Sequence, residues 1–161
     1  TYGDDYFFGG GPGYDNYFKE GEMLTRHGRR YAEILARHSA PGTVLDVGAA
    51  AGYILRGFID AGWRGQGLEP NRTMAARGRS EVGVNINCGT LEDVCQDDLG
   101  GDGSDQNSYD LITMIKVVAH FYDLDRAFRS ASSRTRPGGV WLIETWNRSS
   151  LTARVLGRWW H

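Results

Sequence analysis

Cysteine is scarce in this sequence, and neither sign of charge is in large excess. The 161 residues include two cysteines, Cys88 and Cys95, and carry a formal net charge of −2 at pH 7. Two cysteines cannot build a disulfide framework, and no group of Cys and His has the spacing of zinc ligands. The balanced charge gives no indication of a nucleic-acid partner. We therefore expect a protein of a reduced, cytoplasmic setting, without a metal site and without nucleic acid as a partner.

Long apolar runs are absent as well. No run approaches the roughly 18 residues that a membrane span needs, and no signal-peptide pattern opens the chain. The length suits one domain with a single substantial core. The chain begins without Met and stops at Trp159-Trp160-His161, in or just after an expected amphipathic helix. From these ends we expect a fragment of a longer protein, able to self-associate through its exposed C-terminal edge.

Predicted strands and helices alternate along the chain. Apolar runs typical of buried strands cover residues 43–48, 65–68, 84–86, 110–115 and 140–145. Apolar residues at helical spacing occur over 22–38, 52–61, 71–76 and 124–131, with a loop at 96–108 and a turn at 137–139. Because the strands are apolar rather than alternating, we expect an α/β protein whose parallel sheet is covered by helices on both faces.

The most informative segment, residues 43–55, reads TVLDVGAAAGYIL. An apolar, β-branched run carries Asp46 near its end, and the turn that follows contains only Gly and Ala. Such a turn lets a ligand approach the main chain closely. The dinucleotide-binding pattern G-x-G-x-x-G requires Gly at the position of Ala50 and Gly or Ala at that of Tyr53. An NAD-dependent oxidoreductase therefore matches less well and is kept as an alternative.

Polar side chains stand at the ends of the other predicted strands. The second strand ends at Glu69, whose carboxylate could accept from both hydroxyls of a ribose or could stabilise the start of the next helix. Thr90 follows the third strand, where it could also form a cap with Asp93. Lys116 follows the fourth strand. In parallel sheets, ligands bind beyond the carboxyl ends of the strands, so we expect these residues at one site.

Taken in order, these segments resemble the motifs of class I S-adenosylmethionine-dependent methyltransferases, in particular the small-molecule type 11 and 12 domains. The resemblance covers residues 43–147 and includes the Gly-rich turn, Glu69, the strand that begins Tyr109-Asp110 and the turn at 136–139. It implies a Rossmann-like, doubly wound, mostly parallel sheet, truncated after the fifth strand. Residues 42–161 would form the cofactor-binding core without its C-terminal strands, and residues 1–41 an aromatic segment and helix that cover the cofactor site.

The resemblance also implies an activity and a set of site residues. The activity is transfer of a methyl group from S-adenosylmethionine to an O, N or C atom of a small molecule, with S-adenosylhomocysteine as the product. The implied cofactor-binding positions are Asp46, Gly48, Ala49, Ala50, Gly52, Glu69, Pro70, Thr90, Leu91, Ile115 and Lys116.

Three further residues are candidates for work on the substrate. His120 is the candidate general base, although a His at a helix end also caps carbonyl groups. Tyr14 and Tyr17 are candidates to fold over the cofactor and contact the substrate, or else to anchor the N-terminal segment.

Departures from the family pattern keep a second alternative open. Ala50 replaces the middle Gly of the first motif, and Ala119 replaces a Glu after the fourth strand. Thr90 stands where the family has an acid that accepts a hydrogen bond from adenine, a role that could pass to Glu92. A domain that binds S-adenosylmethionine without catalysis is therefore the other alternative.

Overall fold

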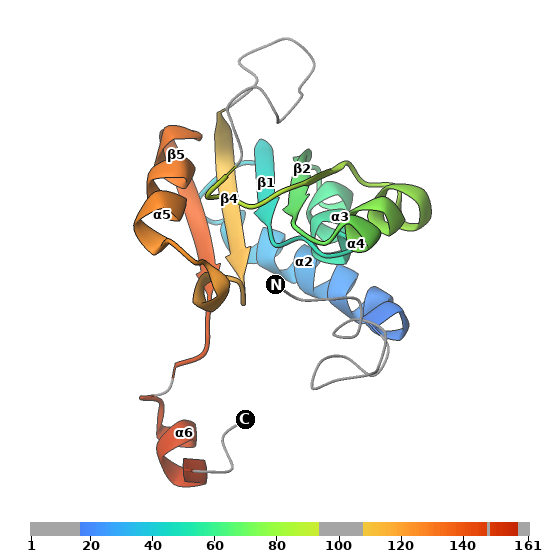
Figure 1. Cartoon of the computed structure of the whole chain (residues 1–161). Coiled ribbons are helices and arrows are strands. Elements are labelled where there is room, and N and C mark those ends of the chain that lie inside the picture. The colour runs from blue at the N-terminus through green and yellow to red at the C-terminus, as the bar shows by residue number, and fades with distance from the viewer. Residues whose placement is uncertain (1–16, 94–107, 148, 158–161) are drawn as a thin grey trace.

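A five-stranded sheet in the order β3-β2-β1-β4-β5 forms the centre of the structure (Figure 1). The computed structural model describes residues 17–93, 108–147 and 149–157. The strands are β1 (Thr43–Val47), β2 (Arg64–Glu69), β3 (Ile86–Cys88), β4 (Tyr109–Ile115) and β5 (Thr135–Glu144). Every neighbouring pair is parallel, so the predicted parallel sheet is confirmed.

The strand order reverses beside β1. The chain moves outward from β1 through β2 to β3, and then returns to place β4 on the other side of β1. Val44 accordingly pairs with Gly65 of β2 and with Leu111 of β4. In open parallel sheets, ligands bind beyond the carboxyl ends of the strands at such a reversal. The topology therefore directs attention to the ends of β1 and β4.

Helices cover both faces of the sheet (Figure 1). The helical elements are η1 (Tyr17–Glu20), α2 (Gly21–Leu35), α3 (Tyr53–Asp60), α4 (Arg72–Arg77), η2 (Gly78–Val82), η4 (Val118–His120), α5 (Leu124–Ser133) and α6 (Leu151–Leu156). One buried cluster joins α2 and α3 to the sheet and includes Leu55, Phe58 and Val44. The other joins α5 to the opposite face and includes Ala127 and Leu45. Consecutive residues of β1 thus face opposite layers, which confirms the doubly wound fold.

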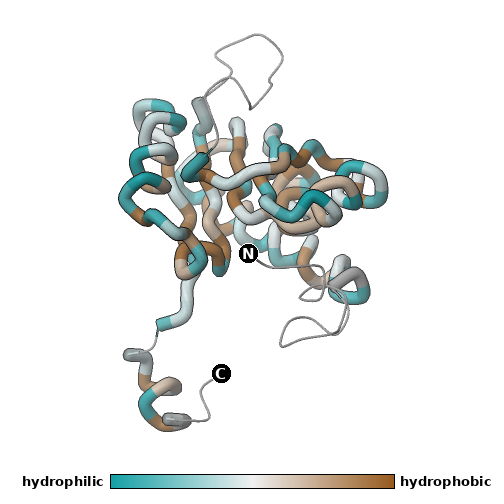
Figure 2. The backbone as a smooth tube through the Cα atoms, viewed as in Figure 1, coloured by the Kyte–Doolittle hydropathy of each residue, from teal (hydrophilic) through white to brown (hydrophobic). Residues whose placement is uncertain are grey.

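The core lies between these layers. Figure 2 shows the apolar residues gathered on the strands, whereas the polar residues lie toward the outside of the helices. Val44, Leu45, Leu111 and Ile112 are all fully buried in the two central strands. Burial on both faces explains why these strands carry unbroken apolar runs.

Polar side chains set the starts of two helices. The Oδ1 atom of Asn71 accepts a hydrogen bond from the N–H of Met74 at 3.0 Å, at the start of α4. Asp123 accepts in the same way from Arg126 at 2.9 Å, at the start of α5. Each of these side chains satisfies an N–H that the first helical turn leaves without a partner.

The third strand lies further along the chain than predicted. β3 spans Ile86–Cys88 rather than residues 84–86. Val84 is buried, but its apolar character serves another contact, since its side chain packs against Gly52 of the turn after β1. The apolar pattern therefore reflects burial at this position and not strand pairing.

The predicted turn at residues 137–139 lies inside β5. Thr135 pairs with Tyr109, whereas Val140 pairs with Leu111, so β5 contains extra residues between the two pairings. Gly138 has a left-handed backbone here, with φ 83°. The turn residues therefore form an irregularity within the strand.

Two further sequence predictions concern loops and membranes. Most of the predicted loop at 96–108 falls in residues 94–107, which lie outside the described part of the chain. Within the described part, no helix combines the length and the apolar character needed to cross a bilayer.

Candidate functional site

A cavity of about 960 Å³ lies beyond the carboxyl ends of the strands. Its walls come from the ends of β1, β2, β4 and β5 and the turns after them, from the segment after β3, and from α2. Of the eleven predicted cofactor positions, those that line the cavity are Asp46, Gly48, Ala49, Ala50, Glu69, Pro70, Thr90, Leu91, Ile115 and Lys116. These residues are far apart in the sequence and meet at the strand reversal.

The turn after β1 is shaped by two glycines. Gly48 and Gly52 have left-handed backbones, with φ of 71° and 78°. A Cβ atom on Gly48 would lie 2.7 Å from a methyl carbon of Val117, and one on Gly52 would lie 2.5 Å from a methyl carbon of Val84. Both positions therefore require glycine for backbone and space. Gly52 faces Val84 and Ile86, and it is the one predicted cofactor position that does not line the cavity.

Ala50, the departure from the family pattern, also has a left-handed backbone, with φ 48°. This conformation costs an L-residue roughly 1–2 kcal/mol. The main-chain N–H of Ala50 donates to Oε2 of Glu69 at 2.8 Å. That buried bond holds the residue in place, so the turn keeps its shape although a methyl group stands where the family has none.

Glu69 is the carboxylate at the end of β2, and it is 5% exposed. Its Oε2 accepts from Ala50 and its Oε1 from the N–H of Asn71, each at 2.8 Å. Burial raises its pKa, and the two main-chain bonds oppose that rise. Each oxygen of a carboxylate can accept a second bond. Because Glu69 lines the cavity, it can still accept hydrogen bonds from a ligand there.

Asp46 is a second buried carboxylate in the cavity wall, 3% exposed. The hydroxyl of Thr113 on β4 donates to its Oδ1 at 2.5 Å. Burial raises the pKa of Asp46 to about 7; the Thr113 bond opposes this rise and the charge of Glu69 adds to it. Asp46 therefore changes its charge near neutral pH, inside the cavity.

Thr90 and Glu92 follow β3 and both line the cavity. The Thr90 hydroxyl donates to the Asp93 carboxylate at 3.1 Å and accepts from the Asp93 N–H at 3.2 Å. The cap considered from the sequence is therefore present. Glu92 is 5% exposed, and its Oε1 accepts from the N–H of Tyr122 at 3.1 Å. This segment thus presents one engaged hydroxyl and one buried carboxylate.

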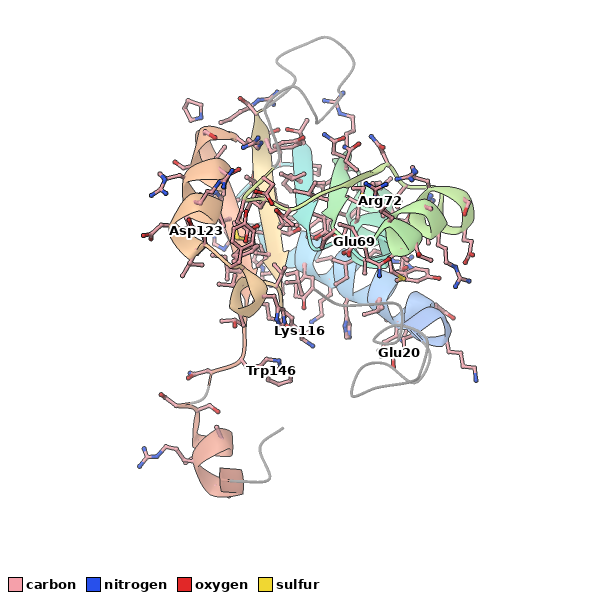
Figure 3. The ribbon with its side chains drawn as sticks, viewed as in Figure 1. Glu20, Glu69, Arg72, Lys116, Asp123 and Trp146 are labelled. Carbon is pink, nitrogen blue, oxygen red and sulfur yellow. The ribbon has the colours of Figure 1, made fainter. Side chains whose placement is uncertain are left out.

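The other half of the cavity contains residues that the sequence did not single out. The hydroxyl of Tyr31 on α2 donates to Oε2 of Glu144, the last residue of β5, at 2.5 Å. Burial, together with this bond and the charge of Glu144, raises the pKa of Tyr31 well above its usual value. Lys116 and Trp146 lie below the ends of β4 and β5 (Figure 3). No local motif marks Tyr31, Glu144 or Trp146.

Lys116 is held close to this group. Its Nζ lies 3.9 Å from Oε1 of Glu144 and 5.2 Å from the centre of the Trp146 ring. Its backbone is left-handed, with φ 56°, and its N–H donates to the carbonyl oxygen of Glu144 at 2.7 Å. The end of β4 is thereby fixed to the end of β5.

The residues expected to act on the substrate are only partly described by the structure. His120, in η4, is exposed and lines the cavity. Tyr14 and the side chain of Tyr17 lie outside the described residues. Among the residues that the structure describes, no group of three or more His, Cys, Asp or Glu could hold a metal ion.

Comparison with protein families gives one match that covers most of the chain. Residues 20–161 match the model of a family described as "Methyltransferase domain". Two curated relatives are ubiquinone biosynthesis O-methyltransferases. That of Rhodopseudomonas palustris is 22% identical over 111 residues, covering 66% of this chain and 40% of the relative. That of a Methylobacterium species is 29% identical over 112 residues, covering 66% and 42%. The chain thus spans about two fifths of the relatives' length.

Solved structures show the same fold. DesVI of Streptomyces venezuelae has a TM-score of 0.65 and 22% identity, with 81% of this chain and 54% of that chain covered. A Thermotoga maritima protein described as a possible histamine N-methyltransferase has a TM-score of 0.61 and 20% identity, covering 90% and 64%. The amino pentose methyltransferase CalS10 of Micromonospora echinaspora has a TM-score of 0.62 and 23% identity, covering 81% and 55%.

Proposed function

Because this chain belongs to the methyltransferase domain family, we propose that it binds S-adenosylmethionine and transfers the methyl group to a small molecule. One observation carries the proposal: the turn of Gly and Ala residues after β1 and the buried carboxylate of Glu69 face the same cavity. The solved structure of CalS10 is described as bound to S-adenosylmethionine, and its fold is that of this chain.

The residues of this cavity suit the cofactor. The turn at Gly48 leaves the main chain open to a ligand, and Glu69 has one further acceptor position on each oxygen. These acceptors match the two neighbouring hydroxyls of a ribose. The volume of about 960 Å³ lies in the usual range of roughly 300–1,000 Å³ for small-molecule sites.

We assign the adenine contact to Glu92 rather than to Thr90. The Thr90 hydroxyl already exchanges two hydrogen bonds with Asp93, whereas Glu92 brings a buried carboxylate to the cavity wall. A carboxylate is also the stronger acceptor for an amino group.

The bound cofactor supplies a methyl group on a positively charged sulfur, and the chain's own residues do the rest. They bind and orient the two reactants and exclude water, which accounts for much of the rate in a direct transfer. Asp46, buried in the cavity wall, favours a positively charged ligand in its ionised form, which predominates above a pH of about 7. His120 lines the cavity and is our candidate to accept a proton from the substrate.

The N-terminal part would cover this site. Three residues of α2 support the idea, since Leu24, His27 and Tyr31 line the cavity. We propose that residues 1–41 act as a cover, with Tyr14 and Tyr17 closing over the ligands, and that residues 42–161 form the core. We further propose a cytoplasmic location, no nucleic-acid partner, and self-association through the C-terminal edge.

Titration calorimetry tests the proposal directly. We expect heat of binding with S-adenosylmethionine and with S-adenosylhomocysteine, and none with NAD. Glu69→Gln should weaken both affinities, whereas Glu33→Gln, an equal change of charge on the exposed side of α2, should not. Binding of NAD alone would instead support the oxidoreductase alternative. Cofactor binding without transfer of labelled methyl to any acceptor would support the non-catalytic alternative.

A further inference from the structure

The charged side chains around the cavity are mostly acidic. Four carboxylates line it, from Asp46, Glu69, Glu92 and Glu144, against a single Lys or Arg among the described residues, Lys116. Two histidines, His27 and His120, also line the cavity. The first three carboxylates lie at or after β1, β2 and β3. Glu144 lies at the end of β5 and has no part in the cofactor site described above.

Glu144 is placed to receive a ligand. Its side chain is 38% exposed, so water and small molecules reach it. The hydroxyl of Tyr31 donates to Oε2 and fixes the carboxylate, while the contact of Oε1 among the described residues is the long 3.9 Å approach of Lys116. A half-exposed ion pair at that distance is weak. The carboxylate is therefore held firmly, and its second oxygen is open to exchange.

A positive charge already occupies the space beside Glu144. The ammonium of Lys116 lies 3.9 Å from Oε1 of this carboxylate and 5.2 Å from the centre of the Trp146 ring. A carboxylate beside an aromatic face is a favourable setting for an ammonium group. The backbone of Lys116 is left-handed, with φ 56°, a strained conformation that proteins retain mostly at functional sites.

On the basis of the proposed function, we propose that Glu144, Tyr31 and Trp146 form the acceptor subsite, and that the acceptor is a small amine. Its ammonium group would take the position of the Lys116 ammonium near Glu144 and Trp146. The Lys116 side chain, which is 50% exposed, then moves out into solvent. The Lys116 ammonium thus occupies the subsite as an internal ligand until the amine displaces it.

The reaction at this subsite balances without a further reagent. The bound ammonium gives one proton to His120, the candidate base of the same cavity, which passes it to solvent, while the Glu144 carboxylate stays ionised. The neutral nitrogen then forms a bond to the methyl carbon, while the bond from that carbon to sulfur breaks and leaves its electron pair on sulfur. The products are the methylated ammonium, S-adenosylhomocysteine and one released proton.

A series of three probes of equal size and different charge tests the inference. Benzylammonium, benzyl alcohol and benzoate are titrated by ligand-observed NMR into the full chain saturated with S-adenosylhomocysteine. We expect benzylammonium to bind most tightly. Calorimetry beforehand shows whether S-adenosylhomocysteine itself binds. Absence of that heat overturns the proposed function, whereas cofactor binding with no preference for benzylammonium overturns only this inference.

Two variants locate the site. Glu144→Gln should weaken benzylammonium binding about tenfold, because a charged hydrogen bond is lost, and should leave S-adenosylhomocysteine binding unchanged. Glu33→Gln, on the exposed part of α2, is the matched control and should change neither. Lys116→Met should strengthen benzylammonium binding, because the competing ammonium is gone. Tight benzoate binding that is lost in Lys116→Met would overturn the inference and make this an anion subsite; this variant decides the question even if Glu144→Gln fails to fold.

Discussion

Gly28 of α2 and Gly57 of α3 cross with no room for a methyl group between the two helices. A Cβ atom on Gly57 would lie 2.7 Å from the Cα of Gly28 and 2.2 Å from the carbonyl oxygen of Thr25. One on Gly28 would lie 2.2 Å from the carbonyl oxygen of Ile54. The close crossing brings α2 against the core, and α2 in turn supplies one wall of the cavity.

This contact predicts the effect of Gly57→Ala. Alanine favours a helix over glycine by about 1 kcal/mol, but the new methyl group would meet main-chain atoms that cannot move aside. We expect the clash to prevail and the free energy of unfolding to fall by about 1–3 kcal/mol. Gly89→Ala is the control, since among the described residues a Cβ there meets Leu68 alone, at an ordinary 3.5 Å. Equal effects in urea denaturation would contradict the prediction.

Glu69→Gln should affect both the turn and the ligand. The amide keeps one acceptor oxygen, but its NH₂ group would face one of the N–H donors of Ala50 or Asn71. A lost buried bond of this kind costs about 1–3 kcal/mol of stability. We expect the Kd for S-adenosylmethionine to rise about tenfold or more. Thermal unfolding and calorimetry separate the two effects, and an unchanged Kd would remove Glu69 from the cofactor site.

Asp46 predicts a dependence of stability on pH. Its pKa is raised from 3.8 to about 7 in the folded protein. The folded state therefore holds the proton more tightly, so this contribution to stability is complete below pH 3.8 and is lost as the pH rises through about 7. The free energy of unfolding should lose up to about 1.4 kcal/mol per pH unit within this window.

The Asp46→Asn variant isolates that contribution, because asparagine keeps an oxygen for the Thr113 hydroxyl but does not titrate. Between pH 4 and pH 7, the unfolding free energy of the unmodified chain should fall steadily relative to that of the variant as the pH rises. Denaturation curves that stay parallel over this range would show that Asp46 does not titrate there.

Thr90→Ala and Glu92→Gln distinguish the two candidates for the adenine contact. We expect the Kd for S-adenosylmethionine to change less than about twofold in the first and to rise about tenfold in the second. The glutamine retains an oxygen for the N–H of Tyr122, so the local structure should persist. The reverse order of effects in calorimetry would return the role to Thr90.

Local sequence patterns are sufficient for the part of the site next to β1 and β2. The turn at Gly48 and the acid at Glu69 each follow a strand directly, and the topology of a parallel sheet brings both to one edge. The first, second, fourth and fifth strands are found close to their predicted positions for the same reason, since each depends on neighbours in the sequence.

The rest of the site depends on contacts that no local pattern encodes. Tyr31 and Glu144 are separated by 113 positions and meet only after the sheet and α2 have packed. Neither lies in a motif. Val84 shows the opposite problem, because its apolar character predicts a strand but reflects packing against Gly52. The roles of the Tyr31–Glu144 pair and of Val84 therefore depend on where these residues lie in the folded chain and not on their sequence neighbours.

The bond between Tyr31 and Glu144 has a consequence for the order in which the molecule matures on the ribosome. Tyr31 is synthesised before its partner, which follows 113 residues later. Domains fold as they emerge, from the N-terminal end. The wall that Tyr31 and Glu144 share is therefore completed only after β5 has been made, and a nascent chain that still lacks Glu144 has an unfinished wall where the methyl acceptor would dock.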